Sequence, residues 1–311
     1  MGVTLGADVE AVADLLATLL PEGLSGLGVA GVREFGRQMD AHIPPGPDVH
    51  TVTEHRVGGP HGEVPVRLYR PQSDSPLPVL LYIHGGGWTF GTLNGSVDHL
   101  CRSIASESGI AVVSVDYRLA PEHKFPIPVD ESVAVLLWLR EEAATLGVDS
   151  KRVAIGGDSA GGNIAAAITH MDRGNLAPLA AQVLIYPATE YAVERASWTE
   201  HANTPALTAR DTLWFWDQYL RDETDRTDPR ATPANAESFT GLPPAFVIVA
   251  GQDPLRDDGL HYAELLKQAG TSTQTECFDG AFHGFMNMPA LAAYTRGVRA
   301  ITRFLTTTLE P

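Results

Sequence analysis

Gly157-Asp158-Ser159-Ala160-Gly161 separates two segments of different pattern. Residues 152–156 before it form a short apolar run typical of a buried strand, and residues 163–171 after it are typical of a helix. A sharp turn with glycine on both sides lets a serine hydroxyl stand clear of the backbone, and the start of a helix aims free N–H groups at it. The stretch therefore predicts a nucleophile elbow at Ser159. In a chain with 30 glycines such a pentapeptide also arises by accident, so the other motifs decide.

A glycine triplet, His84-Gly85-Gly86-Gly87-Trp88, follows the apolar run 78–83. Acyl transfer passes through a tetrahedral oxyanion, which needs two or three N–H donors at about 3 Å. We expect Gly85 and Gly86 to donate, with Ala160 as the third donor. The alternatives are a flexible loop and a phosphate-binding turn, but the Gly-x-Gly-x-x-Gly spacing of the latter is absent. His84 is expected to tie the loop down by hydrogen bonds, since no metal ligand stands at a suitable spacing from it.

An acid and a histidine follow two later apolar runs. Asp253 comes just after the run 244–250, and His283 comes after the predicted strand that begins at residue 277. The acid would fix the tautomer of the histidine, and the histidine would act as general base for Ser159. Asp257 and Asp258 are rival acids, but we expect them in the first turn of a helix that includes residues 260–268, where carboxylates favour the helix dipole.

Four further charged residues lie beside these motifs. Asp116, Arg118 and Glu122 follow the predicted strand 110–115, and we expect them to support the glycine loop. Asp158 adjoins the nucleophile and could serve as a proton donor, but alternate residues of an elbow face opposite sides, so we expect it to point away from the site.

The order of elements predicts an α/β fold with a mostly parallel central sheet flanked by helices. Two alternating runs, 49–57 and 63–69, are joined by a glycine-rich turn and predict a hairpin. Afterwards short apolar runs alternate with helical segments, which is the pattern of parallel strands with crossover helices. The expected strands are 110–115, 152–156, 181–186 and 244–250, and the expected helices include 130–146, 163–171 and 291–309.

Two segments are expected to form a helical cap over the core at 49–311. Residues 1–48 contain an amphipathic stretch at 9–20, for which the alternative is a frayed N-terminal arm. An insertion at about 188–225 interrupts the strand rhythm and carries an aromatic helix at 208–220. Trp88 and Trp214 are the expected substrate-binding side chains, although an aromatic stripe at helical spacing is more often core.

Composition restricts the class of protein. The chain of 311 residues has a formal net charge of −16, which opposes binding to nucleic acid and to anionic membrane surfaces. Cys101 and Cys277 give no disulfide framework and favour a reducing compartment, so we expect a cytoplasmic protein. No stretch approaches eighteen apolar residues, and no basic segment with an apolar core begins the chain. A homodimer through an edge strand or the last helix is conceivable from the pattern.

Five motifs stand in a characteristic order: His84-Gly85-Gly86-Gly87-Trp88, Asp116-Tyr117-Arg118-Leu119-Ala120-Pro121-Glu122, Gly157-Asp158-Ser159-Ala160-Gly161-Gly162, Asp253-Pro254-Leu255 and His283-Gly284-Phe285. They resemble the motifs of the bacterial hormone-sensitive-lipase-like esterases, over most of the chain. The resemblance implies an α/β-hydrolase core with a helical cap, no cofactor, and hydrolysis of short- to medium-chain acyl esters. The related plant hormone receptors, which are not enzymes, lack the histidine that His283 supplies.

Two other functions remain open from the sequence. A hydrolase of amides, lactones or peptides uses the same three residues, and only its leaving group distinguishes it. A non-catalytic small-molecule binding protein would keep the pocket, and reaction of Ser159 with an organophosphonate separates it from an enzyme. In each case the partner would be a small molecule, which the hydrolase would cleave and the binding protein would only bind.

Overall fold

The computed structural model describes residues 7–175, 178–191 and 193–310. Its centre is a sheet of eight strands in the order β1-β2-β4-β3-β5-β6-β7-β8. β2 pairs antiparallel with both β1 and β4, and all the other neighbours pair in parallel. The strands are β1 (Thr51–Gly59), β2 (Gly62–Arg70), β3 (Leu77–Ile83), β4 (Ala111–Val115), β5 (Val148–Asp158), β6 (Ala181–Ile185), β7 (Ala245–Gln252) and β8 (Thr273–Phe282).

β3 illustrates why the apolar runs form central strands. Val79, Leu81 and Ile83 belong to the core on one face of the sheet, and Leu80 and Tyr82 belong to the core on the other face. Side chains alternate between the faces of a strand, so a strand that is covered on both faces is apolar at every position. All five of these side chains are fully buried.

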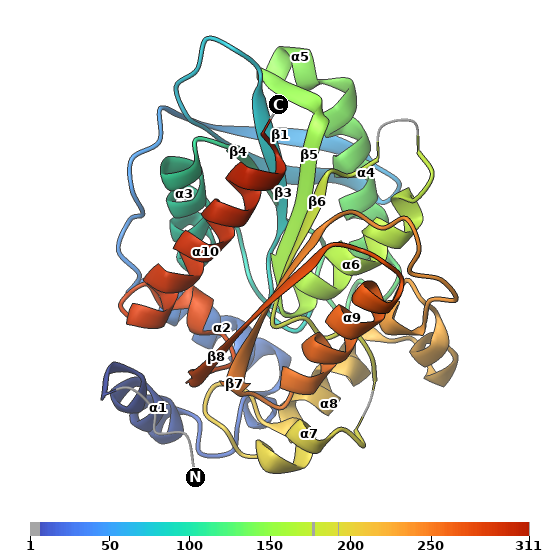
Figure 1. Cartoon of the computed structure of the whole chain (residues 1–311). Helices are drawn as coiled ribbons and strands as arrows, with labels where there is room; N and C mark the ends of the chain where they lie inside the picture. Colours follow the sequence, from blue (N-terminus) through green and yellow to red (C-terminus); the bar gives the residue numbers. More distant parts are fainter. Residues whose placement is uncertain (1–6, 176–177, 192, 311) are drawn as a thin grey trace.

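Helices cover both faces of the sheet (Figure 1). One face carries α3 (Ser96–Ser108) and α10 (Ala292–Thr308), which pack against each other. The other face carries α4 (Ile127–Glu141), α6 (Ala160–Asp172) and α9 (Arg256–Gln268), with the short α5 (Ala143–Leu146) after α4. Single 3-10 turns connect several elements: η1 (Ser25–Leu27), η2 (Glu223–Thr227), η3 (Pro233–Asn235) and η4 (Phe285–Asn287).

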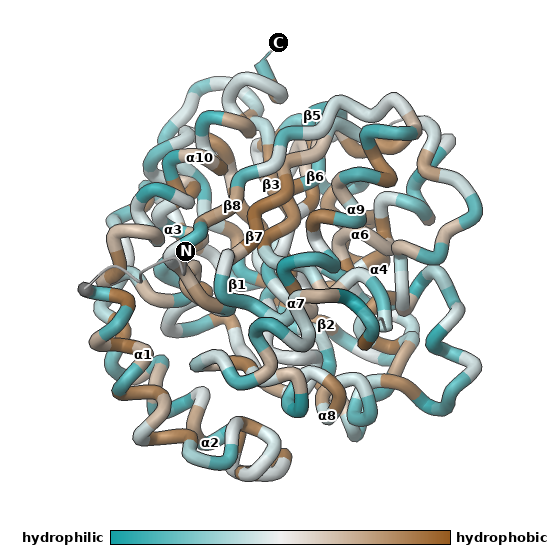
Figure 2. Tube along the Cα trace, turned by 60° about the horizontal axis from the view of Figure 1, so that its bottom comes forward, coloured by the Kyte–Doolittle hydropathy of each residue, from teal (hydrophilic) through white to brown (hydrophobic). Residues whose placement is uncertain are grey.

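Four more helices lie beyond the carboxyl ends of the parallel strands. They are α1 (Ala7–Leu19), α2 (Gly28–Asp40), α7 (Ala196–Glu200) and α8 (Ala209–Tyr219). Figure 2 turns this end of the molecule toward the reader. The segment with α1 and α2 contacts the segment with α7 and α8, since the Ser25 N–H donates to the Asp211 carboxylate of α8 at 2.7 Å. We call the α1–α2 and α7–α8 segments together the covering segments.

The predicted fold is confirmed, with differences in detail. The predicted hairpin is β1–β2, and the amphipathic stretch at 9–20 is α1. The helix expected at 130–146 is two helices, because the chain breaks at Glu142, whose φ and ψ are −90° and 8°. The sequence reading missed α2, in which Gly31 and Gly36 lower the helix propensity. None of the described helices combines the length and apolar character needed to cross a bilayer.

Candidate active site

Ser159 occupies the sharp turn between β5 and α6. Its φ is 54°, in the left-handed region that non-glycine residues rarely adopt. Its backbone N–H donates to the Ile185 carbonyl at 2.8 Å, which fastens the turn to the end of β6. Gly157 and Gly161 lie so close to the Ile83 carbonyl that a Cβ at either position would overlap it. The glycines therefore allow the close approach that holds the strained turn in place.

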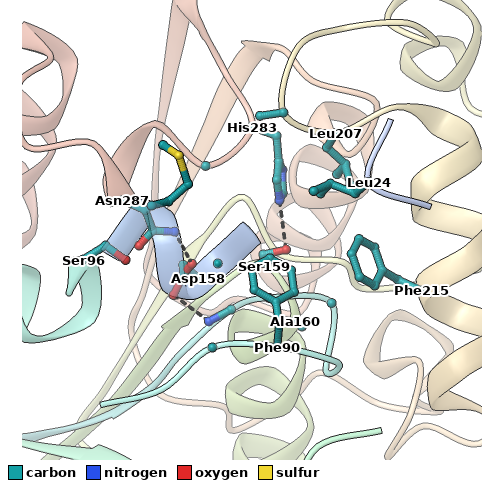
Figure 3. A pocket seen from close by; sticks show the side chains of 18 of the residues that line it. Leu24, Phe90, Ser96, Asp158, Ser159, Ala160, Leu207, Phe215, His283 and Asn287 are labelled. Carbon is teal, nitrogen blue, oxygen red and sulfur yellow. Dashed lines mark hydrogen bonds between the residues drawn. The ribbon is translucent and has the colours of Figure 1, made fainter. Parts of the chain in front are cut away.

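His283 connects Ser159 to Asp253. The imidazole Nε2 lies 2.9 Å from the Ser159 hydroxyl oxygen (Figure 3). On the other side of the ring, Nδ1 lies 2.7 Å from Asp253 Oδ2. Asp253 is fully buried, and its other oxygen accepts the Leu255 N–H at 2.8 Å. The three residues directly follow β5, β7 and β8. A neutral imidazole that donates from Nδ1 to the carboxylate can accept the serine proton at Nε2.

The rival acids have other contacts. Asp257 and Asp258 lie in the first turn of α9, as expected. Asp257 accepts the Ser197 N–H at 2.9 Å, and Asp258 accepts the indole N–H of Trp198 at 3.2 Å. Burial raises the pKa of Asp258 well above its usual value. Both carboxyl groups thus attach α7 to α9.

In the glycine loop, one of the predicted oxyanion donors, Gly85, is not available. The Gly85 N–H donates to Asp158 Oδ1 at 2.9 Å, so it is already occupied. The N–H groups of Gly86, Gly87 and Ala160 have no acceptor among the hydrogen bonds of the described residues. The prediction that Gly85 is a donor is therefore wrong by one position. Gly87, the next but one residue of the triplet, has an available N–H, as do Gly86 and Ala160.

Asp158 is the second correction. Its side chain was expected to point away from the site, but it lines the cavity and accepts the Gly85 N–H, which holds the glycine loop in place. Its Oδ1 also accepts the Tyr82 hydroxyl at 2.7 Å, and its Oδ2 accepts the Asn287 amide at 3.0 Å. Asn287 stands four residues after His283, so Asp158 joins the glycine loop to the loop of the histidine. The sequence did not predict Asn287, and the available signal was a polar amide directly after the apolar pair Phe285-Met286 that follows the histidine motif.

Other contacts support the glycine loop. His84 is buried, its Nδ1 lies 2.7 Å from the Gly85 carbonyl oxygen, and its ring stacks on Tyr117 at 4.4 Å between centroids. The Tyr117 hydroxyl donates to the His84 carbonyl at 2.8 Å. The structural role expected for His84 is thus confirmed, and Tyr117 is its unpredicted partner.

The three charged residues predicted to support this loop behave differently from one another. Glu122 accepts from Arg33 of α2, and the same guanidinium donates to the Thr89 carbonyl at 3.0 Å. Arg118 instead pairs with the buried Glu131 of α4, and burial raises the pKa of Asp116. Only Glu122 is therefore linked to the glycine loop by hydrogen bonds, and it acts through an arginine of the covering segments.

A cavity of about 330 Å³ adjoins Ser159 and His283. Figure 3 shows Leu24, Leu207 and Phe215 on one side of Ser159, and Ser96 and Asn287 on the other. All five line the cavity, which therefore has an apolar side formed by the covering segments and a more polar side.

The two predicted substrate-binding tryptophans differ. Trp88 lines the cavity, but it is only 2% exposed and stacks on Tyr219 with centroids 4.2 Å apart. Trp214 is not among the described residues that line the cavity, which corrects that prediction. Its neighbours Phe215 and Trp216 line it instead, because the helix turns about 100° per residue and presents them to the site.

Comparison with known proteins gives consistent results. Residues 80–287 match a family model described as alpha/beta hydrolase fold. The carboxylic ester hydrolase LipN of Mycobacterium tuberculosis is 44% identical, over 78% of this chain and 67% of its own length. The ethyl acetate hydrolase of Pseudomonas putida is 39% identical, over 73% of each chain.

Comparison with solved structures gives the same kind of relatives. The hyperthermophilic esterase of Pyrobaculum calidifontis superposes with a TM-score of 0.89 at 37% identity, over 98% of this chain and 99% of that one. An α/β hydrolase enzyme from the metagenome of Lake Arreo gives a TM-score of 0.92 at 37% identity, over 98% of both chains. This chain therefore belongs to the α/β-hydrolase family, within the hormone-sensitive-lipase-like carboxylesterases that its motifs resemble, and it is a carboxylic ester hydrolase.

Proposed function

We propose that Ser159, His283 and Asp253 are the catalytic triad of a two-step acyl transfer. His283 takes the proton of Ser159 while the serine oxygen attacks the ester carbonyl, and Asp253 stabilises the imidazolium that forms. The protonated histidine then gives its proton to the leaving alcohol, and an acyl-enzyme remains. Water, deprotonated by the same histidine, releases the acid. The observation that carries the proposal is the continuous pair of hydrogen bonds from Ser159 through His283 to Asp253.

The oxyanion of each tetrahedral intermediate would be held by the N–H groups of Gly86, Gly87 and Ala160. Donors that are fixed before the reaction stabilise developing charge without reorganisation. Gly85 is left out because its N–H already donates to Asp158. The other three N–H groups support the choice, because they have no acceptor among the described residues.

We propose short- to medium-chain acyl esters as substrates. The cavity of about 330 Å³ is at the lower end of the range for small-molecule sites, so it suits an ester with one modest acyl chain. The ethyl acetate hydrolase among the relatives acts on a small ester by name. Residues 1–48 and 188–225 would form the cap, since the apolar side of the cavity comes from Leu24, Leu207 and Phe215.

The test is the initial rate of hydrolysis of p-nitrophenyl esters with two to sixteen acyl carbons, for the native chain and for Ser159→Ala in parallel. We expect turnover confined to short and medium chains, and a loss of several orders of magnitude in the variant, because nucleophile and base act as a unit. Retained turnover in Ser159→Ala would remove Ser159 from the mechanism. No turnover by a folded native chain would favour an amidase, a lactonase or a binding protein.

The cellular setting is also proposed. Cys101 and Cys277 are both unpaired, which supports a reducing compartment such as the cytoplasm. A homodimer would use the exposed edge strand β8 or the adjacent α10, and its test is sedimentation at several protein concentrations.

A further inference from the structure

Hydrogen bonds alone leave the imidazole of His283 with one free motion. Its two partners, Asp253 at Nδ1 and Ser159 at Nε2, lie on opposite ends of the ring. Two bonds at opposite ends fix the line that joins them, but they allow the ring plane to tip about that line. The covalent bond to Cβ limits this tipping, and a surface packed against a face of the ring limits it further.

The Tyr186 ring supplies such a surface. Its centroid lies 4.7 Å from that of the His283 ring, at an interplanar angle of 55°. Distances and tilted angles of this kind are those that aromatic pairs prefer. Within the described part of the chain, Tyr186 is the one aromatic residue paired with this imidazole.

The backbone at Tyr186 is strained in a way that a simple core residue does not require. Its φ is 35°, which a non-glycine residue rarely adopts. Its N–H donates to the Ile248 carbonyl at 2.6 Å, and the preceding Ile185 carbonyl accepts the Ser159 N–H. The same short turn therefore fixes the nucleophile through its backbone and contacts the base through its side chain. Strain of this kind persists where the surroundings hold it in place, often at functional sites.

The hydroxyl of Tyr186 does not take part in these contacts. It is buried, it lies near the backbone of Met286, and it makes no hydrogen bond of good geometry within the described residues. Burial raises the pKa of the phenol well above its usual value, and the nearby carboxylates of Asp158 and Asp253 add to this effect. The group therefore stays neutral at any assay pH and does not compete with His283 for protons.

We propose that Tyr186 is the positioning residue of His283, and that its ring keeps the imidazole plane aligned with both Ser159 and Asp253. The inference rests on the proposed function, in which His283 is the base. A misaligned ring costs rate without weakening ester binding, because proton transfer depends steeply on geometry.

The experiment compares Tyr186→Phe, which keeps the ring, with Tyr186→Leu, which removes it. Active sites are counted by reaction with an organophosphonate, and kcat and KM for p-nitrophenyl butyrate are measured per active site from pH 5 to 9. Tyr186→Phe should stay within about twofold of the native protein, since the lost hydroxyl made no hydrogen bond of good geometry. Tyr186→Leu should lower kcat by about tenfold, the worth of one aromatic pair, with KM unchanged.

The pH profile distinguishes positioning from general damage. Among the described residues, the charged or titratable groups in contact with His283 are Asp253 after β7 and the neutral Tyr186 after β6, and Asp158 at the end of β5 lies near Tyr186. A tipped imidazole loses part of its bond to Asp253, so its protonated form is less stable. The acid limb of kcat/KM should therefore move to lower pH in Tyr186→Leu and stay in place in Tyr186→Phe.

Two results would overturn the proposal. One is an equal loss of kcat per active site in Tyr186→Phe and Tyr186→Leu, which would assign the effect to the hydroxyl. The other is a Tyr186→Leu protein with native kcat per active site and a native acid limb, even if fewer sites react. If Tyr186→Leu does not fold, Tyr186→Met fills the space with a flexible side chain and is judged by the same criteria. Failure of the proposed function is recognised separately, since the native protein would then not react with the organophosphonate at Ser159.

Discussion

The loops at the carboxyl edge of the sheet and the covering segments are held in place by different kinds of contact. At the sheet edge, the backbone N–H of Ser159 donates to the Ile185 carbonyl of β6, and the backbone N–H of Tyr186 donates to the Ile248 carbonyl of β7. Side chains make several of the attachments of the covering segments: Arg33 donates to the Thr89 carbonyl, and Lys124 donates to the Asp217 carbonyl of α8. α8 also has one backbone bond to the core, from the Phe125 N–H to the Tyr219 carbonyl. Backbone contacts survive most substitutions, whereas side-chain contacts do not. The geometry of the proposed nucleophile therefore depends mainly on backbone contacts, and the shape of the cavity depends more on side chains, which a substitution removes.

Among the contacts that hold these two regions in place, the largest effect is expected at Asp158, a side chain that accepts three hydrogen bonds at the sheet edge. Asp158→Ala removes the acceptor of the Gly85 N–H, the Tyr82 hydroxyl and the Asn287 amide together. Loss of alignment in the glycine loop should lower kcat by about 100-fold, the cost of one oxyanion donor. The buried donors left without acceptors should lower the free energy of unfolding by about 3 kcal/mol. Steady-state kinetics and denaturant unfolding measure the two effects.

Asp158→Asn is the matched control, because it keeps one oxygen for Gly85 and Tyr82 and loses the acceptor of Asn287. It should recover a substantial part of both kcat and stability. A native kcat in Asp158→Ala would show that the glycine loop keeps its shape without this carboxylate.

The next effect concerns the covering segments and chain-length preference. Phe215 lines the cavity and lies against Gly87, so Phe215→Ala enlarges the acyl space next to the oxyanion donors. The ratio of kcat/KM for octanoyl to butyryl p-nitrophenyl ester should rise by about tenfold, the lower end of the effects found in hydrophobic pockets. Trp214→Ala on the same helix should leave the ratio unchanged. Equal responses of the two variants would mean that α8 shapes the cavity only as a whole.

The same difference explains what the sequence could predict. Two members of the proposed triad were predictable because Ser159 and Asp253 follow the apolar runs 152–156 and 244–250, and such strands end at the same edge of a parallel sheet. His283 follows β8, an edge strand with several polar residues, and it was predicted from its motif and its place after Asp253. The available oxyanion donors were predicted one residue too early. That choice depends on Asp158, which closes back on Gly85 across 73 positions of sequence, and no local pattern reports such a contact.

Two of the four covering helices, α1 and α8, were predictable from the sequence, but their contacts were not. Amphipathic spacing indicated α1, and the aromatic stripe indicated α8, yet the stripe did not show which of Trp214, Phe215 and Trp216 faces the cavity. That outcome depends on how α8 is rotated against the core, a tertiary property. α2 was missed because its glycines weaken the local signal, and its helix is held by contacts such as that of Arg33 with Glu122.

The smallest effect should appear at the Arg33–Glu122 pair itself, where the covering segments meet the loop after β4. The hydrogen bond from Arg33 lowers the pKa of Glu122 to about 2, against an ordinary value of 4.5. A carboxylate with a depressed folded-state pKa stabilises the fold above its unfolded pKa, and this contribution is lost as the pH falls through the folded value. The native protein should therefore be more stable than Glu122→Gln at pH 6 and lose that advantage between about pH 4.5 and 2. Because Glu122 is 54% exposed, the difference should stay below about 1 kcal/mol and shrink further in 1 M salt. If the stability difference between the two proteins depended on neither pH nor salt, α2 would be held at this point by the bonds of Arg33 to backbone carbonyls and not by charge. The covering segments and the sheet edge would then differ less in how they are held.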